Sequence, residues 1–90
     1  MITFDESKRR VNIAKHGIDL AALSGFFEGV VLTREDVRSA YGELRFQSVG
    51  WHGGEMLFVV WTPGDDDWPR LISARKAERH EREGWAGHCG

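Results

Sequence analysis

The pattern of apolar and polar positions predicts a chain with helices near both ends and most of its strands in the second half. After Asp5, a good N-cap, apolar residues recur at helical spacing, so we expect a helix over the next eleven residues that stops at Gly17. Asp19 is expected to cap a second, short helix from Leu20 to Phe27. Apolar stretches between turn residues predict the strands Ile2–Phe4, Val30–Thr33, Glu43–Gly50, Glu55–Thr62 and Pro69–Ala74.

The last helix is expected to begin at Arg75, directly after the final strand. The predicted order, β-α-α-β-β-β-β-α, describes an α+β fold in which a small antiparallel sheet carries the first two helices on one face. Trp51–Gly54 is typical of a hairpin connection, and loops are expected at Arg34–Asp36 and around Ala40–Gly42. We expect one domain over residues 1–90, with residues 86–90 forming a flexible tail.

The length and composition are those of an ordinary globular domain. A chain of 90 residues has room for one modest core and buries roughly 60–65% of the surface that its unfolded form exposes. No apolar run approaches the ~20 residues needed to span a bilayer, and the first residues lack a signal-peptide layout. Cys89 has no partner within the chain, so no disulfide framework is expected, which fits a cytoplasmic protein.

Positive charge is concentrated at the two ends of the chain, although the formal net charge is only -2. The segment from His16 to Pro69 carries nine acids against three bases. Nine of the twelve Lys and Arg residues lie in two clusters: Lys8, Arg9, Arg10 and Lys15, then Arg70, Arg75, Lys76, Arg79 and Arg82. Such a cationic pole predicts a partner that carries phosphate.

Several short motifs, in order and spread over almost the whole chain, resemble the BrnT family of type II toxins. They are Phe4-Asp5, Lys8, Asn12 and Lys15-His16-Gly17, then Phe26-Phe27, Glu43-Leu44-Arg45-Phe46, Ile72 to Ala77, and Glu81-Arg82. The resemblance implies a RelE-like fold and a ribonuclease that stops translation. It also implies a cognate antitoxin with a ribbon-helix-helix DNA-binding part. The pair would repress its own operon, and the toxin would contact DNA only indirectly, through the antitoxin. A dimer within the toxin–antitoxin complex is compatible with it.

Metal-free RNA cleavage needs a group that takes the proton of the 2′-OH, cations that stabilise the phosphorane-like transition state, and a proton for the leaving oxygen. Arginine suits the second task because its planar fork can hold two phosphate oxygens. In the expected helix Arg75, Arg79 and Arg82 would form one stripe, which Arg45 could join across the sheet. By the resemblance, the predicted catalytic residues are Arg45, Arg75, Lys76, Arg79 and His16, the last as general base, and the predicted RNA-binding residues are Lys8, Lys15 and Arg82.

Each of these residues also has a structural interpretation. Glu78–Arg82 and Arg79–Glu83 are i,i+4 pairs, so the last helix could present a salt-bridged solvated face instead. Likewise, His16 could have a purely structural role at the end of its helix, where Lys15 and His16 are favourably placed next to the negative end of the helix dipole. The four histidines have no metal-ligand spacing, so we predict neither a metal nor a cofactor.

The tryptophans at the loop edges, Trp51 and Trp68, are expected to be partly buried against the sheet, and stacking on bases is the alternative. Trp85 departs from the resemblance, because BrnT-like sequences carry a tyrosine near this place and an indole cannot act as a general acid. The absence of a clear acid–base pair leaves a second function open. This is a non-catalytic RNA-binding or corepressor module that acts in complex with a DNA-binding partner.

Overall fold

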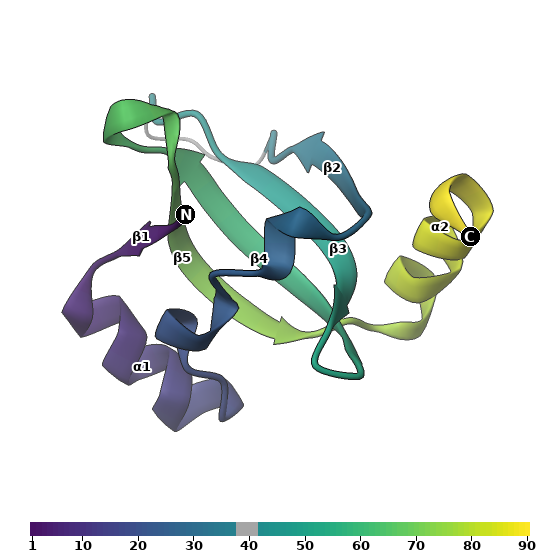
Figure 1. Cartoon of the computed structure of the whole chain (residues 1–90), viewed down its shortest axis with the longest axis horizontal. Coiled ribbons are helices and arrows are strands. Elements are labelled where there is room, and N and C mark those ends of the chain that lie inside the picture. The colour runs from purple at the N-terminus through teal and green to yellow at the C-terminus, as the bar shows by residue number, and fades with distance from the viewer. Residues whose placement is uncertain (38–41) are drawn as a thin grey trace.

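A computed structural model describes residues 1–37 and 42–90, so the loop expected around Ala40 and Tyr41 lies outside the described residues. The elements, in chain order, are β1 (Thr3–Phe4), α1 (Glu6–His16), the 3-10 turns η1 (Leu20–Leu23) and η2 (Phe26–Glu28), β2 (Val31–Glu35), β3 (Phe46–His52), β4 (Glu55–Pro63), the 3-10 turn η3 (Asp65–Asp67), β5 (Pro69–Lys76) and α2 (Arg79–Cys89) (Figure 1). The predicted α+β class is confirmed.

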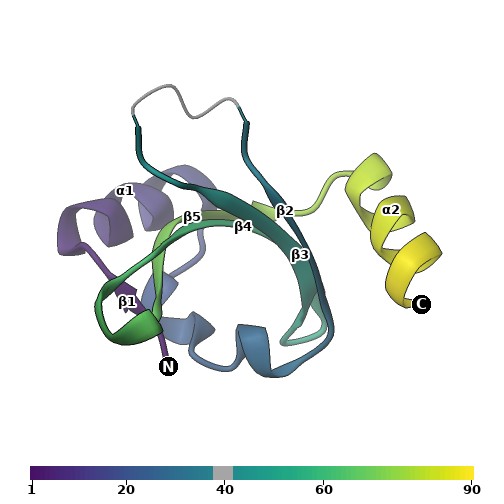
Figure 2. The same ribbon diagram turned by 90° about the horizontal axis from the view of Figure 1, so that it is seen from above.

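The strands form one curved sheet in the order β1-β5-β4-β3-β2 (Figures 1 and 2). The four strands β2 to β5 pair antiparallel with their neighbours, as predicted. The expectation of a wholly antiparallel sheet is wrong for β1, which pairs in parallel with β5 through Thr3–Arg70 and Phe4–Leu71. Because β1 ends at Phe4, the rest of the outer edge of β5 needs another cover.

The first helix closes that edge through one side chain. Asn12, buried in α1, accepts a hydrogen bond from the Ala74 amide at 2.9 Å and donates to the Ala74 carbonyl at 2.9 Å. It also donates to the Ile18 carbonyl at 2.8 Å, just past the helix end. The amide of Asn12 thus replaces a neighbouring strand along this part of β5, and α1 lies at the edge of the sheet.

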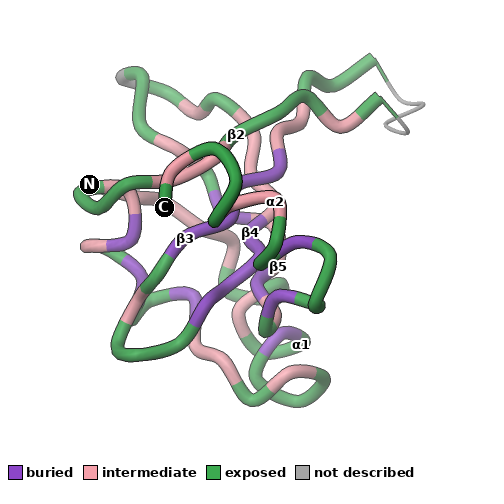
Figure 3. Tube along the Cα trace, turned by 90° about the vertical axis from the view of Figure 1, so that its right-hand side faces the viewer, coloured by how far each residue is buried: buried purple, intermediate pink, exposed green. Residues whose placement is uncertain are grey.

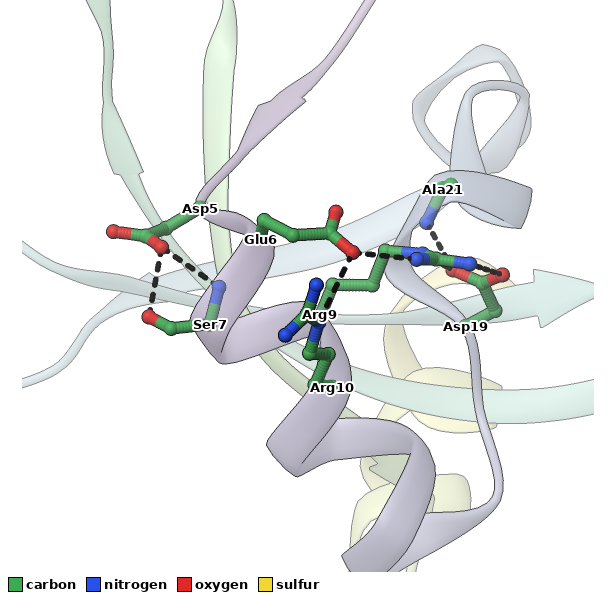
Figure 4. A network of polar contacts seen from close by, with 7 residues as sticks. All are labelled: Asp5, Glu6, Ser7, Arg9, Arg10, Asp19 and Ala21. Atoms are coloured by element: carbon green, nitrogen blue, oxygen red, sulfur yellow. Dashed lines mark hydrogen bonds and ion pairs between the residues drawn. The ribbon is translucent and has the colours of Figure 1, made fainter.

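The bounds of α1 agree with the prediction because both ends are set by local signals. The Asp5 side chain accepts a hydrogen bond from the Ser7 amide at 2.9 Å, and Gly17 ends the helix with φ 70°. Arg9 binds Asp19 through Nε at 2.8 Å and Glu6 through Nη1 at 2.8 Å, so its charge is used to join α1 to the cap of η1 (Figure 4).

The predicted second helix is wrong: the segment forms two 3-10 turns instead. Leu20, Leu23 and Phe26 are spaced three residues apart, and all three are almost completely buried. Residues at i and i+3 project in one direction from a 3-10 turn, so Leu20 and Leu23 both point from η1 into the core. Gly25 separates the two turns.

The two faces of the sheet are covered by different segments. On one face, η1 and η2 pack over Leu57, Val59 and Leu71 (Figure 2). Figure 3 shows that β3 and β4 contain long buried stretches. On the other face, Trp85 of α2 packs against a smaller cluster of Val49, Met56, Phe58 and Ala77. The expectation that two N-terminal helices pack on one face is therefore wrong, since α1 lies at an edge and only the 3-10 turns cover that face.

The start of the last helix also differs from the prediction. Strand β5 continues through Arg75 and Lys76, because β4 is long enough to pair with both, and α2 begins only at Arg79. Glu78 and Glu81 form a capping box at this start. The helix extends to Cys89 and Gly90 is its C-cap, so residues 86–90, expected to form a tail, make up the end of this helix and its cap. No helix in the described ranges is long and apolar enough to cross a membrane.

Candidate active site

A hollow of about 490 Å³ lies between the face of the sheet that carries α2 and the first turn of that helix. Strand register explains its floor, because residues opposite each other on paired strands point to the same face. One row runs Arg34, Gln47, Val60, Ser73, and the next runs Leu32, Val49, Phe58, Arg75. The hollow is lined by Arg34, Glu35, Asp36, Val37, Gln47, Phe58, Arg75, Glu78, His80 and Glu81.

Arg75 is held by three kinds of contact. Its guanidinium lies 4.1 Å from the centre of the Phe58 ring and donates to both carboxylate oxygens of Glu81 at 2.8 Å. It also donates to the Lys76 carbonyl at 3.1 Å and approaches Glu78 at 3.5 Å. The hydrogen bonds from Arg75 to Glu81 raise the pKa of Arg75, so a rigid, permanently charged cation faces the hollow.

Glu81 is the buried partner of this arginine, with a side chain that is 6% exposed. Besides binding Arg75 it accepts a hydrogen bond from the Glu78 amide at 2.7 Å. Burial alone would raise the pKa of Glu81, but the hydrogen bonds from Arg75 and Glu78 and the charge of Arg75 outweigh it and lower the pKa. Glu81 therefore stays ionised and links the start of α2 to β5.

Arg34 is the second cation of the hollow and was missed because the sequence analysis assigned it to a loop. It lies in β2 and donates through Nε to Oε1 of the buried Gln47 at 3.0 Å. That bond does not use Nη1 or Nη2, the pair of nitrogens that can grip phosphate oxygens. No local pattern in the sequence indicated that β2 continues to Arg34, because pairing with β3 sets the length of this strand.

His80 is the histidine that lines the mouth of the hollow. It lies in the first turn of α2, its side chain is 72% exposed, and Nε2 is 4.0 Å from a carboxylate oxygen of Glu81. The sequence analysis gave His80 no role in the site, and His16 was the predicted general base. The position of His80 next to Glu81, which the family motif contains, was the available signal for a role beside Arg75.

Three of the predicted residues, Lys8, Lys15 and His16, line a second hollow of about 400 Å³ between α1 and β5. Ser73 belongs to this second hollow and Gln47 to the first, and Val60 lies between them in the same row. Both hollows therefore open on one face of the sheet. His16 does not lie next to Arg75, so its predicted role as general base stays a prediction without support from proximity.

The remaining predicted residues lie outside the first hollow. Arg45 directly precedes β3, whereas Val49, the β3 residue in the same row as Arg75, lies farther along that strand. Nε of Arg45 is 3.2 Å from a carboxylate oxygen of Glu43. Lys76 lies 3.7 Å from Glu55, and Arg79, with an 86% exposed side chain, lies 2.9 Å from Glu83.

The predicted helical stripe is wrong, because Arg75 belongs to a strand whereas Arg79 and Arg82 belong to α2. The catalytic roles of Arg45, Lys76 and Arg79 stay predictions. In the part of the chain that the structure describes, no three His, Cys, Asp or Glu side chains gather as a metal site would require.

Fold and site together define a small α+β protein with a hollow that combines two arginines of the sheet and a histidine of α2 with four carboxylates. A family model described as "Ribonuclease toxin, BrnT, of type II toxin-antitoxin system" matches residues 4–81. The crystal structure of the Brucella abortus ribonuclease toxin, BrnT, is similar with a TM-score of 0.66 and 32% identity, covering 87% of this chain and 96% of that chain. No curated protein matches the sequence. The chain belongs to the BrnT family of ribonuclease toxins of type II toxin–antitoxin systems.

Proposed function

We propose that this chain is a metal-independent endoribonuclease that cleaves RNA at a phosphate bound by Arg34 and Arg75, and so inhibits translation. The observation that carries the proposal is the hollow that contains these two arginines and His80. Arg75 comes from a strand inside the sheet, is stacked on Phe58 and is fixed by Glu81, which gives the rigid placement that transition-state stabilisation requires.

In the proposed reaction the 2′-oxygen attacks the neighbouring phosphorus while the bond from phosphorus to the 5′-oxygen breaks. The products are a 2′,3′-cyclic phosphate and a 5′-hydroxyl, so atoms balance without water or metal. Arg34 and Arg75 stabilise the charge that develops on the phosphate oxygens. His80, which is 72% exposed at the mouth of the hollow, takes the proton of the 2′-OH and returns a proton to the leaving 5′-oxygen, because histidine is the side chain that most often acts as a general acid and base.

The two arginines contribute differently. Both Nη atoms of Arg75 already bind Glu81, so Arg75 supplies a fixed charge and few unused N–H groups. Arg34 is held through Nε, so its Nη1 and Nη2 remain for a two-point contact with the phosphate. Lys8 and Lys15, in the second hollow on the same face, would bind the RNA backbone farther along the strand.

The family membership supports further parts of the proposal. We propose a cognate antitoxin with a ribbon-helix-helix part that neutralises the toxin, and a complex, in which the toxin can be dimeric, that represses its own operon in the cytoplasm. In this complex the toxin reaches DNA only through the antitoxin. We also propose that the sheet and its flanking helices are RelE-like.

The proposal is tested with the purified chain, freed of any partner, on an end-labelled RNA in the presence of EDTA. Arg34→Ala and Arg75→Ala are expected to lower the cleavage rate by about 10²–10³-fold, the usual effect of removing one transition-state donor. His80→Gln is expected to lower it by about 10²–10⁴-fold. Arg10→Ala is the matched control, since Arg10 carries the same charge on α1, is 77% exposed, and lies outside both hollows.

Equal loss in Arg10→Ala and Arg75→Ala would reject the assignment of the site. Binding of RNA by the wild type without any cleavage would reject the enzyme and favour the non-catalytic RNA-binding or corepressor module. The engagement of Arg75 by Glu81 is the observation in favour of that second function.

A further inference from the structure

Beside the start of α2 lies a third hollow, of about 220 Å³, whose wall combines an exposed indole with two cations. Trp51, at the end of β3, is 52% exposed, and the side chains of Lys76 and Arg82 lie around it. Gly54, in the adjoining turn, has no atom within 4 Å of where a Cβ would stand, so the approach to this wall is open.

The Trp51 ring is fixed from behind. It packs edge to face on Trp85, with ring centres 6.4 Å apart and an interplanar angle of 87°. Trp85 in turn donates a hydrogen bond from Nε1 to the Val30 carbonyl at 3.0 Å. A fixed aromatic ring loses little conformational entropy when a second ring stacks on it. Trp85 thus acts as a support for Trp51, and it lies beyond residues 4–81, the range that the family model matches.

An exposed aromatic ring with cations at its side is the chemistry by which proteins hold unpaired bases and their phosphates. The charges around the third hollow also favour a phosphate. Its lining contains one carboxylate, Glu55, which lies 3.7 Å from Lys76, so Arg82 is the cation that would bind the phosphate. This third hollow and the first one flank the first turn of α2, because Glu78, His80 and Glu81 line one and Arg82 the other.

We propose that the third hollow is a base-stacking subsite, in which an unpaired base of single-stranded RNA stacks on Trp51 and its phosphate contacts Arg82. The inference rests on the proposed function for the identity of the ligand. It adds a second position, outside the cleavage site, at which the protein binds the RNA strand. Because stacking is available to every base, this subsite would favour unpaired RNA over paired RNA and would not select a sequence.

The test measures binding of a short, fluorescently labelled 2′-O-methyl RNA, which cannot be cleaved because its 2′-oxygen is blocked. Trp51→Ala is expected to weaken binding by about 5- to 100-fold, and Trp51→Phe, which keeps an aromatic ring and the packing on Trp85, to retain most of it. Trp68→Ala is the matched control, since Trp68 is 40% exposed and lies outside the three hollows. Arg82→Gln should weaken binding and reduce the slope of log affinity against log salt by about 0.7.

Wild-type affinity in Trp51→Ala, or equal losses in Trp51→Ala and Trp68→Ala, would overturn the proposal. So would a loss of antitoxin binding in Trp51→Ala with RNA binding intact, because the surface would then serve a protein. Cleavage of unmodified RNA by the wild type is measured separately. Trp51-dependent binding without cleavage would support the subsite and reject the proposed ribonuclease, whereas cleavage without Trp51-dependent binding would do the opposite.

Discussion

Replacing Glu81 by glutamine should show how far the candidate site depends on one buried carboxylate. Glu81 accepts two hydrogen bonds from Arg75, both of 2.8 Å, and a third of 2.7 Å from the Glu78 amide. Glutamine has one acceptor oxygen, and its NH₂ group would face a guanidinium that has only donors. The substitution therefore removes at least one charge-assisted bond and the charge that holds Arg75 over Phe58.

The size of the effect follows from these contacts. A hydrogen bond to a charged group contributes about 1.5–3 kcal/mol, but the Arg75 side chain is 29% exposed, so water recovers part of the loss. We expect Glu81→Gln to lower the free energy of unfolding by about 1.5–2.5 kcal/mol, measured by urea denaturation followed through tryptophan fluorescence. RNA cleavage should fall as well, because Arg75 would no longer be fixed in the hollow.

Glu83→Gln is the matched control for this measurement. It makes the same chemical change two residues along the same helix, where Glu83 pairs with Arg79 at 2.9 Å and the two side chains are 65% and 86% exposed. Exposed pairs of this kind contribute about 0–1 kcal/mol, so little change is expected. If the two variants lose the same stability, the reasoning that Glu81 links α2 to β5 is refuted.

Three further predictions concern the acid range and the packing of the sheet. The pKa of Glu81 in the folded protein lies below the ordinary value of 4.5. Ionised Glu81 therefore stabilises the fold above pH 4.5, and this stabilisation is lost as the pH falls through the folded pKa. Below pH 4.5 the stability of Glu81→Gln should thus fall less steeply than that of the wild type. Asn12→Ala should cost about 2–4 kcal/mol in urea denaturation, because the buried amide and carbonyl of Ala74 lose their partner. Gly50→Ala should cost about 1–3 kcal/mol, since its Cβ would stand 2.7 Å from Cγ1 of Val31.

The chain offers a matched control for each of the two packing variants. Val11→Ala, next to Asn12 on α1 and 62% exposed, should change stability by less than about 0.5 kcal/mol. Gly84→Ala in α2, where a Cβ meets no atom within 4 Å, should stabilise by up to about 1 kcal/mol, the opposite sign to Gly50→Ala. A loss in Asn12→Ala no larger than in Val11→Ala would disprove the role of the edge contact, and equal effects at the two glycines would disprove the steric argument. If the free energy of unfolding of Glu81→Gln falls as steeply below pH 4.5 as that of the wild type, Glu81 is not the group responsible for the loss of stability in acid.

Local signals predicted the parts of the fold that local forces decide. The helix α1 has its expected bounds, because Asp5 caps its start and Gly17, with φ 70°, ends it within the same few residues. The hairpin between β3 and β4 was also expected, and Gly53 and Gly54 provide the two positive φ values, 60° and 81°, that a tight two-residue turn requires. In both cases the residues that make the structure are adjacent in the chain.

Strand lengths were not predictable in this way, because the partner strand sets them. Glu35 belongs to β2 since it pairs with Phe46, and Lys76 belongs to β5 since it pairs with Leu57. Both pairings join residues far apart in the sequence, and nothing next to Arg34 or Arg75 indicates them. The error mattered for the site, because extending these two strands moves Arg34 out of a loop and Arg75 out of a helix, and brings both into one hollow.

The placement of Arg75 on a strand changes what a cation there can do. On an exposed helix it would be one of several solvated arginines, as Arg79 is, paired with Glu83 and 86% exposed. On β5 it shares a row with Phe58 and meets a buried carboxylate, so its position is determined by the sheet and by the start of α2 together. Fixing the charge in this way uses most of the N–H donors of Arg75, so under the proposed function a bound phosphate would also need a second arginine whose terminal nitrogens do not bind a carboxylate. Arg34, held through Nε, lies three strands away on β2, so under the proposed function both arginines contribute and the loss of either is expected to lower the rate of cleavage.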